Sequence, residues 1–194
     1  MTKSIETPRA GLLHYVVDTR ASRLTVQAFA TGVLAAMGHN PKIGVRSFSG
    51  GVDFNPEIPE ASAFRLSMQS NSFTVSDDVS DKDRREIERL MNEQVLEVVK
   101  YPEILYEAPS VSVTRLESAL YSATLNGNLS FHGVTRTQSV NARIAEFGEM
   151  LRTSGEFTLR QTDFGVKPIS VAGGALKVKD EIKFTFEMIV RKME

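Results

Sequence analysis

Histidine offers the most varied chemistry in this chain, and it occurs at His14, His39 and His132. No pair of these residues has the i, i+2 or i, i+4 spacing that typically marks a metal site. The chain contains no cysteine, which excludes thiolate nucleophiles, disulfides and zinc–thiolate sites. It also contains neither a G-x-S-x-G elbow nor a P-loop. The sequence therefore predicts no catalytic residue and no metal site.

Two of the histidines lie in tight connections. His39 follows Gly38 and precedes Asn40, so its imidazole either bonds to nearby backbone groups or stands at a pocket mouth. His132 precedes Gly133 at an expected hairpin, where a His-Gly pair tolerates turn geometry. We keep His39, Asn40 and His132 as candidate contacts for a ligand headgroup.

A second polar group lies in the segment Arg160–Gly165, where an expected strand ends. Arg160 either forms a local pair with Asp163 or points its guanidinium at an anionic or polar headgroup. The triplet Asp163-Phe164-Gly165 also occurs in kinases, but the other kinase motifs are missing from this sequence. Arg160 and Asp163 therefore join the candidate headgroup contacts.

The composition is that of an ordinary globular domain. Of the 194 residues, 41% are apolar and 24% are charged, and the net charge of −1 argues against a nucleic-acid-binding surface. No stretch approaches the roughly 18 apolar residues of a transmembrane helix, and the first residues lack the apolar core of a secretory signal. We expect a cytoplasmic protein with a flexible arm over residues 1–12 and a single domain over 13–194.

Alternation of apolar and polar residues is the dominant pattern and indicates strands with one buried face. The pair Gly50-Gly51 inside one such segment predicts a bulge or a sharp bend. Strands joined by short turns predict an antiparallel sandwich or barrel, and a barrel of about eight strands can leave room for a small apolar ligand. The expected strands span 14–18, 24–29, 42–54, 64–69, 104–114, 120–131, 139–147, 150–159 and 181–191.

One segment has helical periodicity instead. Ser80 is a suitable N-cap, and Tyr101-Pro102 disfavours helix, so we expect an amphipathic helix over about 81–99. This helix could plug or cover an open end of a curved sheet. A short helical turn is expected near 31–37. The apolar stripe of the long helix comprises Ile87, Leu90, Met91, Val95 and Val98.

Several short motifs occur in a fixed order along the chain. They are Gly38-His39-Asn40, Phe48-x-Gly50, Lys100-Tyr101-Pro102, the run from Gly127 through His132-Gly133 to Thr135, and Arg160-x-x-Asp163-Phe164-Gly165. Together they resemble the YceI-like family across roughly residues 13–192. The resemblance implies a lipocalin-like, antiparallel up-and-down β-barrel with the helix beside it. It also implies a long apolar tunnel that binds polyisoprenoids or other amphiphilic lipids.

The resemblance singles out His39, His132, Arg160, Asp163 and Phe164 as recurring positions. It implies no cofactor other than an isoprenoid or other lipid that co-purifies. The apolar side chains that we expect to line the tunnel are Leu24, Val26, Phe64, Leu66, Met68, Leu129, Phe131, Phe164, Phe184 and Phe186.

Three functions are consistent with the sequence. The first is a non-catalytic binding or carrier protein for an apolar amphiphile such as a polyisoprenoid, a quinone or a fatty-acid-type lipid. The second is an enzyme that acts on a bound apolar substrate, which requires His39, His132 and Arg160 to converge on one cavity. The third is a stress-response interaction module with a filled barrel. A homodimer is left open.

Overall fold

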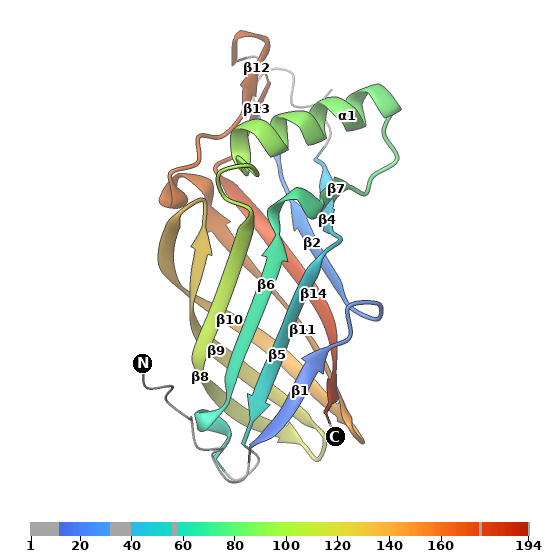
Figure 1. Ribbon diagram of the computed structural model, residues 1–194, viewed down its shortest axis with the longest axis vertical. Helices are drawn as coiled ribbons and strands as arrows, with labels where there is room; N and C mark the ends of the chain where they lie inside the picture. Colours follow the sequence, from blue (N-terminus) through green and yellow to red (C-terminus); the bar gives the residue numbers. More distant parts are fainter. Residues whose placement is uncertain (1–11, 32–39, 56–57, 175, 194) are drawn as a thin grey trace, which may run out of the picture.

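Eight antiparallel strands close into a barrel (Figure 1). The structure is a computed structural model and describes residues 12–31, 40–55, 58–174 and 176–193. The last barrel strand pairs with the first, at Val190 with Val17, so the predicted barrel is confirmed. In spatial order the strands are β1 (Leu13–Val17), β5 (Phe48–Phe54), β6 (Ala63–Gln69), β8 (Glu103–Glu117), β9 (Leu120–Phe131), β10 (Val134–Phe147), β11 (Met150–Arg160) and β14 (Glu181–Lys192).

Three shorter strands extend the wall beyond β14 at the upper end of the barrel in Figure 1. They are β2 (Arg23–Gln27), β4 (Lys42–Val45) and β7 (Phe73–Val75). The segment 42–54, expected as one strand, is therefore two strands with different partners. β4 pairs with β2 and β7, whereas β5 pairs with β1 and β6.

The bulge lies elsewhere than expected. Gly50 and Gly51 pair in regular register with β6, so the predicted bulge there is wrong. A Cβ atom on Gly51 would lie 2.8 Å from the Tyr15 carbonyl oxygen, which means that glycine allows close approach of the two strands. The register shifts instead in β8, between Glu107 and Ser110, around Pro109. A proline is tolerated at a bulge because no ladder hydrogen bond is required there.

The helix lies across the upper end of the barrel (Figure 1). It comprises α1 (Asp81–Leu90) and a π-helical continuation, η4 (Met91–Val95), so it ends before the predicted residue 99. The chain leaves helical geometry at Glu97, whose φ is +42°. Among the described residues, no helix is long and apolar enough to cross a membrane.

Side chains of α1 cover the free edge of β7. Arg84 donates to the carbonyl oxygens of Val75 and Asp77, and the Glu88 carboxylate accepts the Val75 N–H at 2.9 Å. The helix begins where Ser80 Oγ accepts the Asp83 N–H at 3.1 Å. These bonds hold the helix over the end of the sheet. They also satisfy the outer edge of β7, which pairs with β4 on its other side and with no described strand on this one.

A small second sheet pairs β13 (Leu176–Val178) with both β3 (Ala30–Thr31) and β12 (Ser170–Val171). The expected helical turn near 31–37 begins at Thr31, which belongs to β3, and otherwise lies outside the described residues. The expected arm lies outside them as well, apart from Leu12. Single 3₁₀ turns occupy η2 (Pro59–Ala61), η3 (Ser70–Ser72), η5 (Gln161–Phe164) and η6 (Ala172–Gly174).

Candidate functional site

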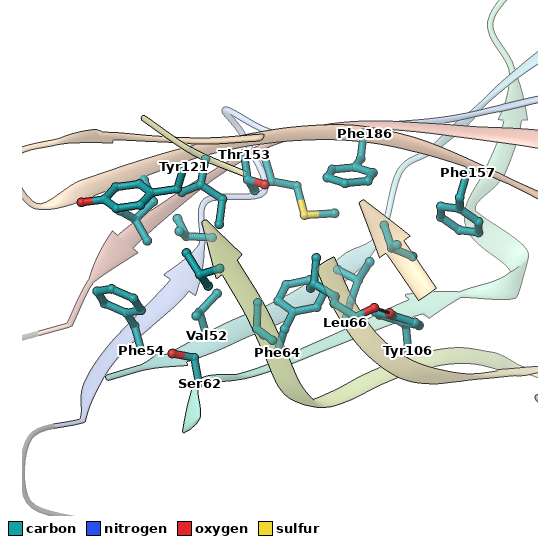
Figure 2. A pocket seen from close by; sticks show the side chains of 18 of the residues that line it. Val52, Phe54, Ser62, Phe64, Leu66, Tyr106, Tyr121, Thr153, Phe157 and Phe186 are labelled. Atoms are coloured by element: carbon teal, nitrogen blue, oxygen red, sulfur yellow. Dashed lines mark hydrogen bonds between the residues drawn. The ribbon is translucent and has the colours of Figure 1, made fainter. Parts of the chain in front are cut away.

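The barrel is hollow over its lower half. A cavity of about 420 Å³, which we call the lower chamber, lies between the walls and is lined at one end by Tyr121 and Glu146. Figure 2 shows Phe64 and Phe186 pointing toward each other from opposite walls of this space. Its lining includes seven of the predicted tunnel residues: Leu24, Phe64, Leu66, Met68, Leu129, Phe184 and Phe186.

Strand periodicity explains the apolar lining. Tyr121, Leu125 and Leu129 are spaced four residues apart in β9, so they project from the same face and all reach the chamber. Phe157 of β11 and Phe184 of β14 stack with ring centroids 4.9 Å apart and planes at 5°. Both rings are only partly buried although they point inward, because part of each ring faces empty space.

Two glycines make room for aromatic rings along the wall. A Cβ atom on Gly155 would lie 2.6 Å from Cζ of Phe186, and one on Gly127 would lie 2.7 Å from Cζ of Tyr106. Such distances are too short for real carbon contacts. The rings therefore lie across the glycines, and a larger residue at either position would force a ring to move.

The Tyr106 hydroxyl is satisfied by the barrel wall. Its oxygen lies 2.9 Å from the carbonyl oxygen of Gln138 and 3.1 Å from that of Leu125. Burial raises the pKa of the Tyr106 phenol to about 12. The phenol is therefore neutral and hydrogen-bonded, and its ring adds apolar surface to the lower chamber.

Polar groups of the lower chamber gather where the strands end. Arg115 lies near the end of β8, Tyr121 near the start of β9, and Glu146 near the end of β10. The Tyr121 hydroxyl donates to the Glu146 carboxylate at 3.3 Å, and the Arg115 guanidinium lies 6.0 Å from the Tyr121 ring centroid. The lower end therefore combines an apolar interior with a polar rim.

A second cavity of about 600 Å³, the upper chamber, lies between the barrel and the helix. Leu129 and Phe184 line both chambers, so the two spaces meet at these side chains. Predicted residues Val26 and Phe131 line the barrel side of the upper chamber. The helix side is formed by Ile87, Leu90, Met91 and Val95, which belong to the stripe recognised from helical periodicity.

Phe164 is the predicted tunnel residue that lines neither chamber. It is 2% exposed, and its ring centroid lies 5.5 Å from that of Phe131, so it packs behind the wall. The prediction also omitted lining residues such as Tyr121, Ile144 and Phe157. The same strand alternation identifies them, because each lies two or four residues from another inward side chain.

The four predicted headgroup contacts that the structure describes, Asn40, His132, Arg160 and Asp163, line neither chamber. Asn40 is exposed, and its Oδ1 accepts the Ala30 N–H at 2.8 Å. His132 forms an ion pair or hydrogen bond with the Glu97 carboxylate, and its ring centroid lies 4.4 Å from that of Tyr101. His39 lies outside the described residues.

Arg160 and Asp163 also bond elsewhere. Arg160 Nε lies 2.9 Å from the Asp180 carboxylate, so the local pair with Asp163 does not form. The Asp163 carbonyl oxygen accepts from the Arg136 guanidinium. Hydrogen bonds from Thr162 and from Arg160 hold the pKa of the Asp180 carboxyl below its usual range. These contacts fasten the turn after β11.

Metal ligation has no counterpart in this geometry. Within the part of the chain that the structure describes, no three His, Asp or Glu side chains are grouped closely enough to hold a metal ion.

Comparison with known proteins places this barrel among relatives. A UPF0312 protein of Pseudomonas syringae pv. tomato is 24% identical over 185 residues, which cover 92% of this chain and 87% of that protein. A UPF0312 protein of Azotobacter vinelandii is 25% identical over 160 residues, which cover 79% of this chain and 76% of that protein.

Solved structures share the fold. A polyisoprenoid binding domain from Saccharophagus degradans matches with a TM-score of 0.68 and 15% identity, over 93% of this chain and 99% of that one. BcnA of Burkholderia cenocepacia matches with a TM-score of 0.66 and 17% identity, over 89% and 98% respectively. The model of the YceI-like domain matches residues 15–190, which extend from within β1 to near the end of β14. The chain therefore belongs to the YceI-like domain family.

Proposed function

We propose that this protein is a non-catalytic binding or carrier protein for a long apolar amphiphile, such as a polyisoprenoid, a quinone or a fatty-acid-type lipid. The observation that supports this most directly is the pair of adjoining apolar chambers of about 420 and 600 Å³. The two chambers share Leu129 and Phe184 in their linings. The binding activity named for the Saccharophagus degradans domain, which shares this fold, agrees with the proposal.

Ordinary apolar side chains are sufficient for this function. Burying one methylene contributes about 0.8 kcal/mol, so one five-carbon isoprene unit contributes about 4 kcal/mol when it is fully buried. A difference of about 4 kcal/mol corresponds to roughly a thousandfold in Kd. Part of the total is offset by the cost of association. Affinity should therefore rise steeply with chain length until the chambers are filled.

The two alternative functions find less support. The enzyme hypothesis required His39, His132 and Arg160 to meet at one cavity, but His132 and Arg160 line neither chamber. The interaction-module hypothesis required a filled barrel, whereas the lower chamber lies inside this barrel and the upper chamber lies between the barrel and the helix. Cytoplasmic location and a homodimer stay predictions from the sequence.

The first test is organic extraction of the purified protein followed by mass spectrometry, which should identify a co-purified lipid. The second is delipidation and titration with isoprenoid alcohols of increasing length, monitored by thermal unfolding. A ligand at 100 times its Kd stabilises the native state by about 2.7 kcal/mol. For a domain of this size that raises Tm by about 5 to 11 °C. An empty protein that gains no stability with isoprenoid alcohols, quinones or fatty acids would contradict the proposal.

A further inference from the structure

A buried amide lies in the wall of the upper chamber. Gln161 follows β11 as the first residue of η5, is 3% exposed, and lines the chamber. Among the described residues of that lining it is the one buried side chain with a polar group, since Asp83, Glu86 and Lys177 are exposed at the rim.

The orientation of the amide follows from its partner. The side-chain nitrogen Nε2 lies 2.9 Å from the Lys179 carbonyl oxygen. A carbonyl oxygen only accepts hydrogen bonds, so the atom that faces it must be the NH₂ group. The main chain is fixed as well, because the Gln161 N–H donates to the Asp180 carbonyl at 2.9 Å and the Gln161 carbonyl accepts from Val166 at 3.1 Å.

This leaves the amide oxygen Oε1, which has no hydrogen-bond partner among the residues that the structure describes. Asn92 Oδ1 is the one side-chain oxygen among the described residues that is fully enclosed and has no hydrogen-bond partner. Gln161 Oε1 differs from it, because it is not fully enclosed. The residue as a whole is buried and lines the chamber, which is the open space beside it. An acceptor without a donor in an apolar space lacks the hydrogen bond that water would supply.

The charges at the rim balance one another. Asp83 and Glu86 contribute two carboxylates to the chamber lining, but the Glu86 carboxylate is paired with Arg89 at 2.8 Å, which leaves Asp83 against the ammonium group of Lys177. A carboxylate or phosphate headgroup would therefore meet an acceptor oxygen inside, with no net positive charge at the rim to offset it. A neutral headgroup with an O–H or N–H donor avoids this conflict.

We infer that Gln161 is a specificity-determining residue, whose Oε1 accepts a hydrogen bond from the headgroup of a neutral amphiphile such as a long-chain alcohol, a primary amide or a hydroquinone. This inference rests on the proposed function, because it assigns the headgroup of the same apolar ligand. It places the donor in the upper chamber, with the chain directed toward Leu129 and Phe184.

The test compares three ligands with the same chain: farnesol, farnesyl methyl ether and farnesoic acid. Each is titrated into delipidated protein at pH 7.5 by competition with a fluorescent fatty-acid probe. One hydrogen bond to Oε1 should make farnesol bind about 3- to 10-fold more tightly than the ether. The ionised acid should bind most weakly. In the Gln161→Leu variant the ratio of alcohol to ether affinity should fall to one or below, with the ether affinity unchanged.

The matched control is Gln138→Leu, because Gln138 lines neither chamber and its side chain donates to the Ser139 carbonyl. That variant should keep the wild-type ratio. Equal binding of alcohol and ether to the wild-type protein, tightest binding of the acid, or an unchanged ratio in Gln161→Leu would each overturn the inference while leaving apolar binding intact. If none of the three ligands binds, the proposed function fails too. If Gln161→Leu does not fold, the wild-type ligand ranking decides.

Discussion

Replacing Val140 with phenylalanine tests whether the lower chamber is available space. Val140 is 4% exposed and lines that chamber, whereas Val17 of β1 is 5% exposed and lines neither chamber. The same substitution at these two strand positions therefore adds a ring toward an opening in one case and into packed core in the other. Val17→Phe is the matched control.

The two variants should differ in their effect on Tm. Overpacking at Val17 should cost about 1 to 3 kcal/mol, which lowers Tm by about 2 to 12 °C for a domain of this size. Val140→Phe should leave Tm unchanged or raise it, because four added carbons enter a space of about 420 Å³. Those four carbons displace ligand. At about 0.8 kcal/mol each they weaken binding of a chamber-filling isoprenoid by about 3 kcal/mol, or roughly a hundredfold.

Thermal unfolding of the delipidated proteins and probe displacement by farnesol measure the two effects. Val17→Phe should bind farnesol as the wild type does, at a temperature below its own transition. An equal decrease in Tm in both variants, or wild-type farnesol affinity in Val140→Phe, would show that the lower chamber lacks the free space that this prediction requires.

Three further outcomes follow from single residues. The raised pKa of Tyr106 means that the folded state loses stability as the pH rises from about 10 to 12, by about 2 to 3 kcal/mol, because the unfolded chain releases the phenolic proton first. Tyr106→Phe should remove that part of the alkaline loss in denaturant titrations, at a cost of about 1 kcal/mol at pH 7. The lowered pKa of Asp180 stabilises the folded state at neutral pH, and the effect is lost as the pH falls through this lowered pKa. Asp180→Asn should therefore be less stable than wild type at pH 7, by a difference that shrinks as the pH falls below about 4. A gain of stability in Asp180→Asn at pH 7 would refute this. Gly155→Ala should lower Tm in thermal unfolding and displace the Phe186 ring, because its Cβ atom would clash with the Asn141 carbonyl oxygen and would lie 2.6 Å from Cζ of Phe186. Gly148→Ala meets no atom within 4 Å, so it should cost only the strain of a side chain at a φ of +59° and leave farnesol affinity unchanged.

Local patterns predicted most of the elements correctly. Alternation identified the strand Leu120–Phe131 at its observed bounds, because side chains face the barrel interior and the outside in turn along its whole length. The helix start at Ser80 followed from its capping residues, which act within one turn. The helix end was placed too late, because Val98 continues the apolar stripe although the backbone turns at Glu97.

Partners that are distant in sequence were beyond local patterns. Arg160 lies three residues from Asp163 in the chain, yet it pairs with Asp180, which the antiparallel pairing of β11 and β14 brings beside it. The split of 42–54 into β4 and β5 has the same origin, since the two halves pair with different strands. Ion pairs and strand partners depend on which segments meet across the sheet, and the sequence pattern of one segment does not contain that information.

The sequence by itself determined that this chain forms antiparallel strands with one apolar face, because the period of two along each strand assigns every side chain to one face. That pattern fitted a sandwich or a barrel, and the resemblance to the YceI-like family favoured the barrel. Only the tertiary structure decided that the interior is hollow. Whether inward side chains meet at the centre depends on the closure of β1 onto β14 and on the tilt of the rings across Gly127 and Gly155. The tertiary structure also places Gln161 as a buried amide at the wall of the upper chamber, a role that its place in the sequence does not reveal.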